Sequence, residues 1–91
     1  MTIHKYPLRV TDTQEIPMPF GAEILCVQVQ HGTPCLWAIV KPSKLNPLQP
    51  KTIEVYGTGH DMPQDMGINR KYIGTFQMNS GSLVFHVFER V

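Results

Sequence analysis

Apolar and polar residues alternate along most of this chain, and twice the alternation stops at a glycine-containing turn and then resumes. The two stretches are residues 27–33 and 76–82. Alternation that breaks at a short loop containing glycine is typical of a β-hairpin. The sequence therefore predicts two similar hairpins, with tight turns at residues 31–32 and 80–81.

The rest of the chain offers further short strands and no long helix. Eight prolines and seven glycines are spread along it, and no long window carries apolar residues at helical spacing. We expect strands over residues 3–8, 13–18 and 51–56, and a surface connection over the proline-rich residues 41–51. The prediction is one all-β domain over residues 1–91, a small sandwich or barrel-like sheet of six to seven short antiparallel strands.

The turns fix which residues share a face of each hairpin. A two-residue turn at residues 31–32 places Gln28 opposite Cys35 and Cys26 opposite Trp37. The two cysteines are then diagonal neighbours, and we expect free thiols because a disulfide needs closer Cβ atoms. The predicted core faces are Leu25, Val27, Val29, Leu36, Ala38 and Val40 in the first hairpin, and Gly74, Phe76, Met78, Leu83, Phe85 and Val87 in the second.

The opposite faces of the hairpins mix polar and aromatic groups and form the first candidate binding surface. Amides beside an indole and an imidazole can stack a ring and bond its edge, as sites for small molecules and nucleobases do. Such faces also suit a subunit or partner interface, which is the favoured interpretation, and a homo-oligomer is expected for so small a domain. If both hairpins lie in one sheet, or are related by an internal pseudo-two-fold, the surface gathers Gln28, Cys35, Trp37, Gln77 and His86, with Trp37 as its aromatic anchor.

A long loop over residues 57–71 is the second candidate site. Its glycines could turn backbone N–H groups toward an anion, and two cations at its far end would add positive charge. We rank this loop below the strand surface because a sheet holds side chains more rigidly. The candidate loop residues are Gly57, Thr58, Gly59, His60, Arg70 and Lys71.

The net charge and the small number of candidate catalytic residues limit which classes of function this protein can have. A net charge of +1 gives no long-range field toward nucleic acid or an anionic membrane. The chain carries no secretory signal, and its longest apolar run, residues 36–40, is too short to span a bilayer, so we expect a cytoplasmic protein. Neither cysteine has a cationic sequence neighbour that would lower its pKa, so a cysteine-dependent enzyme with His86 as base is a minor alternative. We expect no cofactor and no metal.

Several stretches together carry a family resemblance. They are IHKYPL (3–8), ILCVQV (24–29) with PCLWA (34–38), VYGTGH (55–60), and YIGTFQ (72–77) with LVFHVF (83–88). Over nearly the whole chain they resemble a family of small uncharacterised proteins of bacteriophages and prophages. The resemblance implies a context rather than an activity: an accessory factor that acts on host machinery, or a virion or assembly component.

Taken together, these observations favour a non-enzymatic binding protein in the host cytoplasm. Its expected partner is a host target, either a defence or metabolic protein or a small nucleotide-like signal. The first alternative is a virion or assembly component, and the second is a small-ligand-binding protein or cysteine-dependent enzyme.

Overall fold

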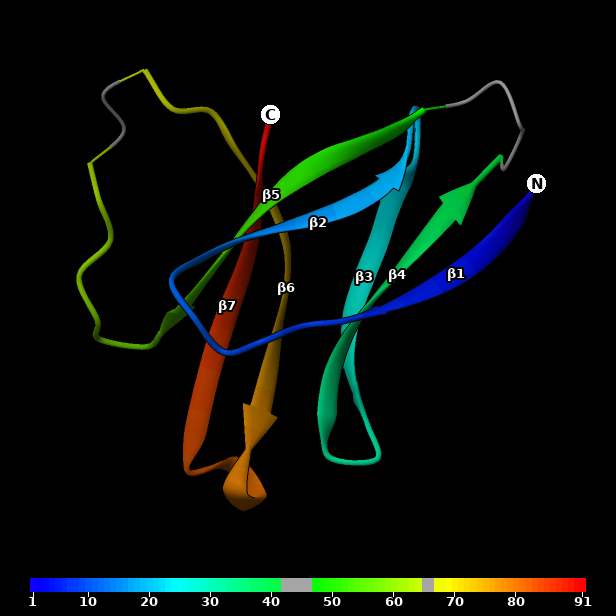
Figure 1. Ribbon diagram of the computed structural model, residues 1–91. Coiled ribbons are helices and arrows are strands. Elements are labelled where there is room, and N and C mark those ends of the chain that lie inside the picture. The colour runs from blue at the N-terminus through cyan, green and yellow to red at the C-terminus, as the bar shows by residue number, and fades with distance from the viewer. Residues whose placement is uncertain (42–46, 65–66) are drawn as a thin grey trace.

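The computed structural model describes residues 1–41, 47–64 and 67–91, and in this part of the chain every long element is a β-strand (Figure 1). A single turn of 3₁₀ helix, η1 (Asn79–Gly81), joins the last two strands. The predicted all-β fold is confirmed. The strands are β1 (Thr2–Pro7), β2 (Thr13–Pro19), β3 (Glu23–Gln30), β4 (Thr33–Val40), β5 (Leu48–Gly57), β6 (Arg70–Met78) and β7 (Leu83–Arg90).

The described strands form two antiparallel sheets that pack into a flat sandwich-like body of 42 × 36 × 16 Å. Sheet A has the strand order β1-β4-β3, and sheet B has the order β2-β5-β7-β6. Each hairpin therefore belongs to a different sheet, which excludes the shared sheet as the way in which the first candidate surface forms. The edge strand β3 of sheet A nevertheless lies beside the edge strand β6 of sheet B (Figure 1), so the hairpins meet at the junction of the sheets.

Apolar residues from both sheets make one core. Met18, Leu36, Ile53 and Val87 are fully buried in it, and they come from four different strands. Burial of side chains of this size contributes about 1.5–3 kcal/mol each relative to leaving them exposed. The core therefore holds the two sheets together without a hydrogen-bond ladder between β3 and β6.

The first hairpin has the predicted turn and the predicted register. His31 and Gly32 have φ values of 50° and 78°, both in the left-handed region that a two-residue hairpin turn of this kind requires. Gln28 lies opposite Cys35, and Cys26 lies opposite Trp37.

Two positions on the predicted core face of this hairpin are wrong. A β-bulge between Ile24 and Cys26 inserts one extra residue, which reverses the alternation toward the start of β3. Ile24 is therefore buried and Leu25 is 43% exposed. Val29 is also exposed, at 39%, because it lies near the end of the hairpin at the free edge of β3.

The second hairpin has the predicted pairing but a longer turn. Phe76 lies opposite Phe85 and Gly74 lies opposite Val87, which is the pairing that a turn centred on residues 80–81 implies. The connection spans residues 79–82 rather than two residues, and Asn79, Ser80 and Gly81 all have positive φ. The longer loop places Leu83 at the rim, 44% exposed, rather than in the core.

Two other strands begin earlier than the sequence indicates. β5 starts at Leu48, inside the predicted surface connection, because this end of β5 pairs only with the edge strand β2. Pro17 and Pro50 lie opposite each other there. A proline has no N–H to donate to the ladder, and a two-stranded part of the sheet tolerates this better than its centre does. β6 starts at Arg70, so Arg70 and Lys71 belong to a strand rather than to the loop. Residues 42–46 of the predicted connection lie outside the described residues.

Candidate functional site

A groove runs along the junction of the two sheets, between β3 and β6, and we call it the seam groove. It has a volume of about 360 Å³, at the lower end of the range for ligand sites. Its floor is apolar and its rim is polar, and none of its six residues carries a charge. The lining residues are Val27, Gln28 and Val29 from β3, and Thr75, Phe76 and Gln77 from β6.

Gly74 allows the two edge strands to approach at one end of the groove. A Cβ atom built on Gly74 would lie 2.9 Å from Cγ1 of Val27 and 3.9 Å from the backbone nitrogen of Val27. Any residue with a side chain would therefore push β3 and β6 apart. The glycine sets the closed end of the seam groove, and residues 75–77 form the wall that continues from it.

Gln28 and Gln77, both sequence-predicted candidates, lie on opposite walls of this groove. Both side chains are exposed, and each amide offers a donor and an acceptor. They meet because the edges of two sheets adjoin, and not because the hairpins share a sheet. Phe76 and Val27 are buried between them and give the groove its apolar floor.

Four side chains on the outer face of sheet B form a second feature, which we call the hydroxyl–imidazole chain. Nε2 of His86 lies 2.6 Å from Oγ1 of Thr58, and Nδ1 lies 3.0 Å from Oγ1 of Thr75. The hydroxyl of Tyr72 lies 2.5 Å from the same Thr75 oxygen. Both ring nitrogens of His86 are thus engaged. Thr75 belongs both to the hydroxyl–imidazole chain and to the wall of the seam groove.

The other two predicted surface residues, Cys35 and Trp37, lie away from the groove. Trp37 is on the outer face of sheet A, where the Nζ of Lys5 lies 6.0 Å from its ring centroid and donates to Gln30 at 2.6 Å. Cys26 and Cys35 are free thiols, and Cys35 is buried. Strands β3 and β6 separate β4, which carries Cys35, from β7, which carries His86, so the structure does not bring a thiol to the imidazole.

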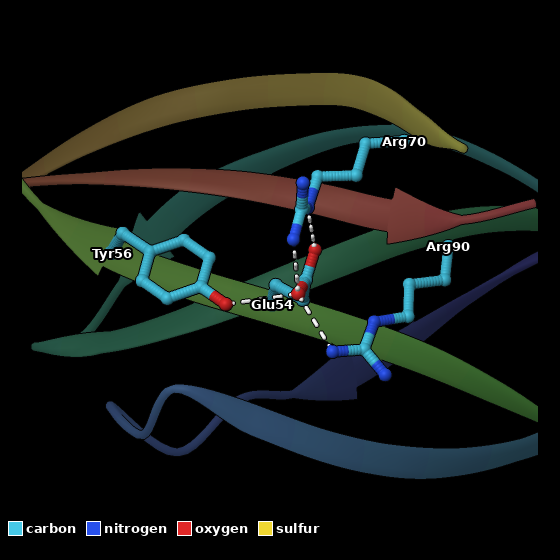
Figure 2. A network of polar contacts seen from close by, with 4 residues as sticks. All are labelled: Glu54, Tyr56, Arg70 and Arg90. Atoms are coloured by element: carbon cyan, nitrogen blue, oxygen red, sulfur yellow. Dashed lines mark hydrogen bonds and ion pairs between the residues drawn. The ribbon is translucent and has the colours of Figure 1, made fainter. Parts of the chain in front are cut away.

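The second candidate site, the loop over residues 57–71, differs more from its prediction than the strand surface does. Arg70 is held inside sheet B and is not free to bind an anion. Its guanidinium donates to both carboxylate oxygens of Glu54 (Figure 2), and its side chain is 8% exposed. Arg90 donates to the same carboxylate at 2.9 Å, and so does the hydroxyl of Tyr56, at 2.9 Å. Two cations and a phenol thus surround one fully buried carboxylate.

This network determines the protonation of its members. Burial raises the pKa of the Glu54 carboxyl, but the hydrogen bonds from Arg70, Tyr56 and Arg90 outweigh burial and hold its pKa below the ordinary value. Burial, together with the hydrogen bond to the Glu54 anion, raises the pKa of the Tyr56 phenol. The hydrogen bond to Glu54 also raises the pKa of Arg70. At neutral pH the Glu54 carboxylate is therefore ionised and the Arg70 guanidinium is charged.

The glycine-rich start of the loop is bonded to the protein itself. The Thr58 amide donates to the carbonyl of Val84 at 3.0 Å, and the His60 amide donates to the carbonyl of Gly57 at 3.0 Å. A Cβ atom on Gly57 would lie 2.8 Å from Nδ1 of His60, so the imidazole packs against the glycine. One of the N–H groups expected to face an anion, that of Thr58, is therefore already used, and so is the neighbouring N–H of His60.

The remaining loop candidates, Gly59 and Lys71, are both exposed. Gly59 has a φ of 85° and so makes a turn. Lys71 lies in β6 opposite Glu89. Within residues 1–41, 47–64 and 67–91 there is no group of three or more His, Cys, Asp or Glu residues arranged to hold a metal ion. Arg70 and the Thr58 amide, which an anion site in this loop would use, are thus bound within the protein.

Sequence reasoning missed the ion network and the hydroxyl–imidazole chain. The prediction of a half-buried strand at residues 51–56 leaves Glu54 and Tyr56 exposed, yet both are buried. The signal present in the sequence is a glutamate between Ile53 and Val55, with two arginines at the ends of the next strands. The two arginines reach this glutamate only because of the register of three strands, and a local sequence pattern does not reveal that register.

Comparison with known proteins adds a family and no activity. No curated protein matches the chain, and no solved structure matches it. In the described part of the chain there is no helix long and apolar enough to cross a membrane. One family model, described as "Domain of unknown function (DUF7352)", matches residues 1–91. The chain therefore belongs to the DUF7352 family.

Proposed function

We propose that this protein is a non-enzymatic binding module that binds a partner protein through one continuous surface. The surface consists of the seam groove and the adjoining hydroxyl–imidazole chain. The observation that carries the proposal is the placement of Gln28 and Gln77, two exposed amides from different sheets, on opposite walls of one groove.

The composition of the groove supports a binding role. Its apolar floor at Val27 and Phe76 offers area to desolvate, and its amide rim offers directional hydrogen bonds, which is the usual division in an interface. The groove is open, and its rim is uncharged. These features favour a protein segment over a compact anionic ligand such as a nucleotide.

The hydroxyl–imidazole chain supports the same surface by holding one wall in place. Thr75 is fixed by His86 on one side and by Tyr72 on the other, so its position on the groove wall is set before a partner arrives. A preorganised contact loses less conformational entropy on binding. The engagement of both His86 nitrogens also favours a structural role for this residue over a role as a general base.

The proposed partner and its cellular location follow from the sequence resemblance. The sequence resemblance to small bacteriophage and prophage proteins supports a phage-type accessory role, in which the partner is a host protein in the cytoplasm. A homo-oligomer remains part of this proposal, because exposed apolar residues such as Leu25 and Tyr72 lie on the outer faces of both sheets.

Affinity capture from host lysate tests the proposal, with bound proteins and retained small molecules read together by mass spectrometry. The wild-type protein is compared with the double variant Gln28→Ala/Gln77→Ala. Gln64→Ala is the matched control, because Gln64 is an exposed glutamine in the loop that follows β5. We expect the double variant to lose a captured protein that the control keeps. Equal capture by all three proteins contradicts the proposed surface.

A further inference from the structure

The two walls of the seam groove are free edges of β-sheets. β3 pairs only with β4 in sheet A, and β6 pairs only with β7 in sheet B. No backbone hydrogen bond joins β3 to β6 in the described part of the chain. An edge strand presents unpaired N–H and C=O groups, and such groups are a template for pairing with another extended chain.

The hairpin register identifies the unpaired groups of β3. Gln30 and Thr33 flank the two-residue turn and form a hydrogen-bonded pair, so Val29 and Pro34 form the next, non-hydrogen-bonded pair. Pro34 has no N–H to give, and its carbonyl accepts from Leu8 on the side of β1, which agrees with this alternation. The backbone polar groups of Val29, and of Val27 two residues earlier, therefore point into the groove.

A single hydrogen bond identifies the unpaired groups of β6. The carbonyl of Val84 on β7 accepts from Thr58 at 3.0 Å, so the polar groups of Val84 face β5. Gln77 lies opposite Val84 and forms a non-hydrogen-bonded pair with it. The backbone groups of Gln77, and of Thr75 two residues earlier, therefore point away from β7 and toward the groove.

We propose that an extended peptide segment of a partner protein binds in the seam groove by strand addition. This inference rests on the proposed binding function and names the form of the occupant. The main chain of the segment bonds the free backbone groups of Val29, Thr75 and Gln77, beyond the closed end at Gly74 and Val27. An extended backbone suits these walls because it presents donors and acceptors in alternation along both of its edges.

The groove also sets the side-chain chemistry of the segment. Alternate side chains of a strand point to opposite faces. One set would pack on Phe76 and Val27, which favours small or branched apolar residues, and the other set would meet the amides of Gln28 and Gln77. Because no lining residue is charged, the central residues of the segment are uncharged. The closed end at Gly74 and Val27 stays packed, and no ladder bond has to break if β3 and β6 move apart beyond it to admit the strand.

Amide hydrogen exchange of the free protein, read by NMR, gives the first test. We expect the amides of Val29, Thr75 and Gln77 to exchange at least about tenfold faster than those of Gln28 and Phe76, which bond within their hairpins. Equal protection of both sets would mean that the edges are already paired, with each other or with a second copy of the chain. That result overturns the proposal.

A peptide probe gives the second test. Nine-residue peptides are selected on the wild-type protein from a random display library, and the best binder is synthesised with N-methyl groups at successive positions. We expect N-methylation at each central position to weaken binding at least about tenfold, because successive N–H groups of the peptide bond opposite walls and each lost hydrogen bond leaves a partner unpaired. Uniform tolerance of N-methylation, or the absence of any selected peptide, overturns strand addition.

A pair of protein variants separates this inference from the proposed function. Val29→Pro removes one groove-facing N–H and no ladder bond, and Gln28→Ala with Gln77→Ala removes the side-chain amides only. We expect Val29→Pro to weaken binding of the probe peptide about tenfold.

The outcomes separate the two proposals. If capture from lysate depends on the glutamines while Val29→Pro and N-methylation have no effect, the binding surface stands and strand addition is wrong. If binding depends on neither, the proposed function fails as well. The N-methylated peptides leave the protein unaltered, so a folding defect in Val29→Pro does not decide the outcome.

Discussion

Oγ1 of Thr75 lies 3.0 Å from Nδ1 of His86, and this contact links the wall of the seam groove to the polar chain on the outer face of sheet B. Thr75 is on β6 and His86 is directly opposite on β7. The second nitrogen of His86 reaches Thr58, beyond the end of β5. The hydroxyl–imidazole chain therefore ties the β6 edge to the centre of the sheet and limits how far that edge can move.

Replacing Glu54 should destabilise the protein more than replacing an exposed glutamate. Glu54→Ala leaves two guanidinium groups without their shared anion, and removing one partner of a buried pair typically costs several kcal/mol. Because the Arg90 side chain is 36% exposed, solvent screens part of this loss, and we expect about 2 kcal/mol in the free energy of unfolding. Urea denaturation measures it. Glu15→Ala on β2, an exposed position, is the control and should stay within about 0.5 kcal/mol.

The same carboxylate predicts a loss of stability in acid. The pKa of Glu54 is lower in the folded protein than its ordinary value, so its ionised form stabilises the fold at neutral pH. This contribution is complete above about pH 4.3, the ordinary glutamate pKa, and is lost as the pH falls through the lower folded value. Thermal unfolding between pH 5 and pH 2.5 should therefore show a steeper decline for the wild type than for Glu54→Gln. Parallel declines would mean that Glu54 makes no acid-linked contribution.

Gly74 should be replaceable only if Val27 is reduced at the same time. Gly74→Ala places a Cβ 2.9 Å from Cγ1 of Val27, and overpacking of this kind costs about 1–3 kcal/mol. Val27→Ala removes the obstructing methyl groups, so in the double variant the penalty from Gly74→Ala should largely disappear. A double-mutant cycle by denaturation measures this coupling. Additive effects would contradict the close approach of β3 and β6.

The first hairpin turn should depend on its glycine. Gly32 has a φ of 78°, a conformation that a β-branched residue adopts only under strain. Gly32→Val should lower the free energy of unfolding by about 1 kcal/mol or more. Thr33→Val, the adjacent exposed strand position, is the matched control and should have a small effect. If both variants melt like the wild type, the turn assignment is wrong.

The features that the sequence predicts well are local. Alternation and a glycine turn are enough to place Gln28 opposite Cys35, and Phe76 opposite Phe85, because a hairpin's register follows from its turn. The bulge after Ile24 is not visible in this way, since Ile24 and Leu25 are both apolar and either could face the core.

The features that the sequence does not predict depend on contacts between distant strands. The sequence pattern groups Gln28 with Gln77 through a shared sheet or an internal pseudo-two-fold, whereas in the structure the junction of two sheets brings them together. Arg70 resembles a loop cation until the register of β6 and β7 places it beside Glu54. Trp37 has the composition of an anchor, yet its strand lies on the far side of β3 from the groove.

The position of Trp37 gives a prediction that separates the groove from the sheet A face. Because Trp37 lies on the outer face of β4 beneath Lys5, Trp37→Ala should leave partner capture within about threefold of the wild type. Circular dichroism checks that the variant is folded. Loss of capture in a folded Trp37→Ala protein would move the recognition surface to sheet A.

Site-specific photo-crosslinking identifies which surface of the protein contacts its partner. A photoreactive amino acid is placed in turn at Gln28, Gln77 and Gln64, and each protein is irradiated in the host cell. If the seam groove is the recognition surface, positions 28 and 77 crosslink to the same partner protein and position 64 does not. Crosslinking from position 64 alone, or to unrelated proteins from positions 28 and 77, would contradict the account.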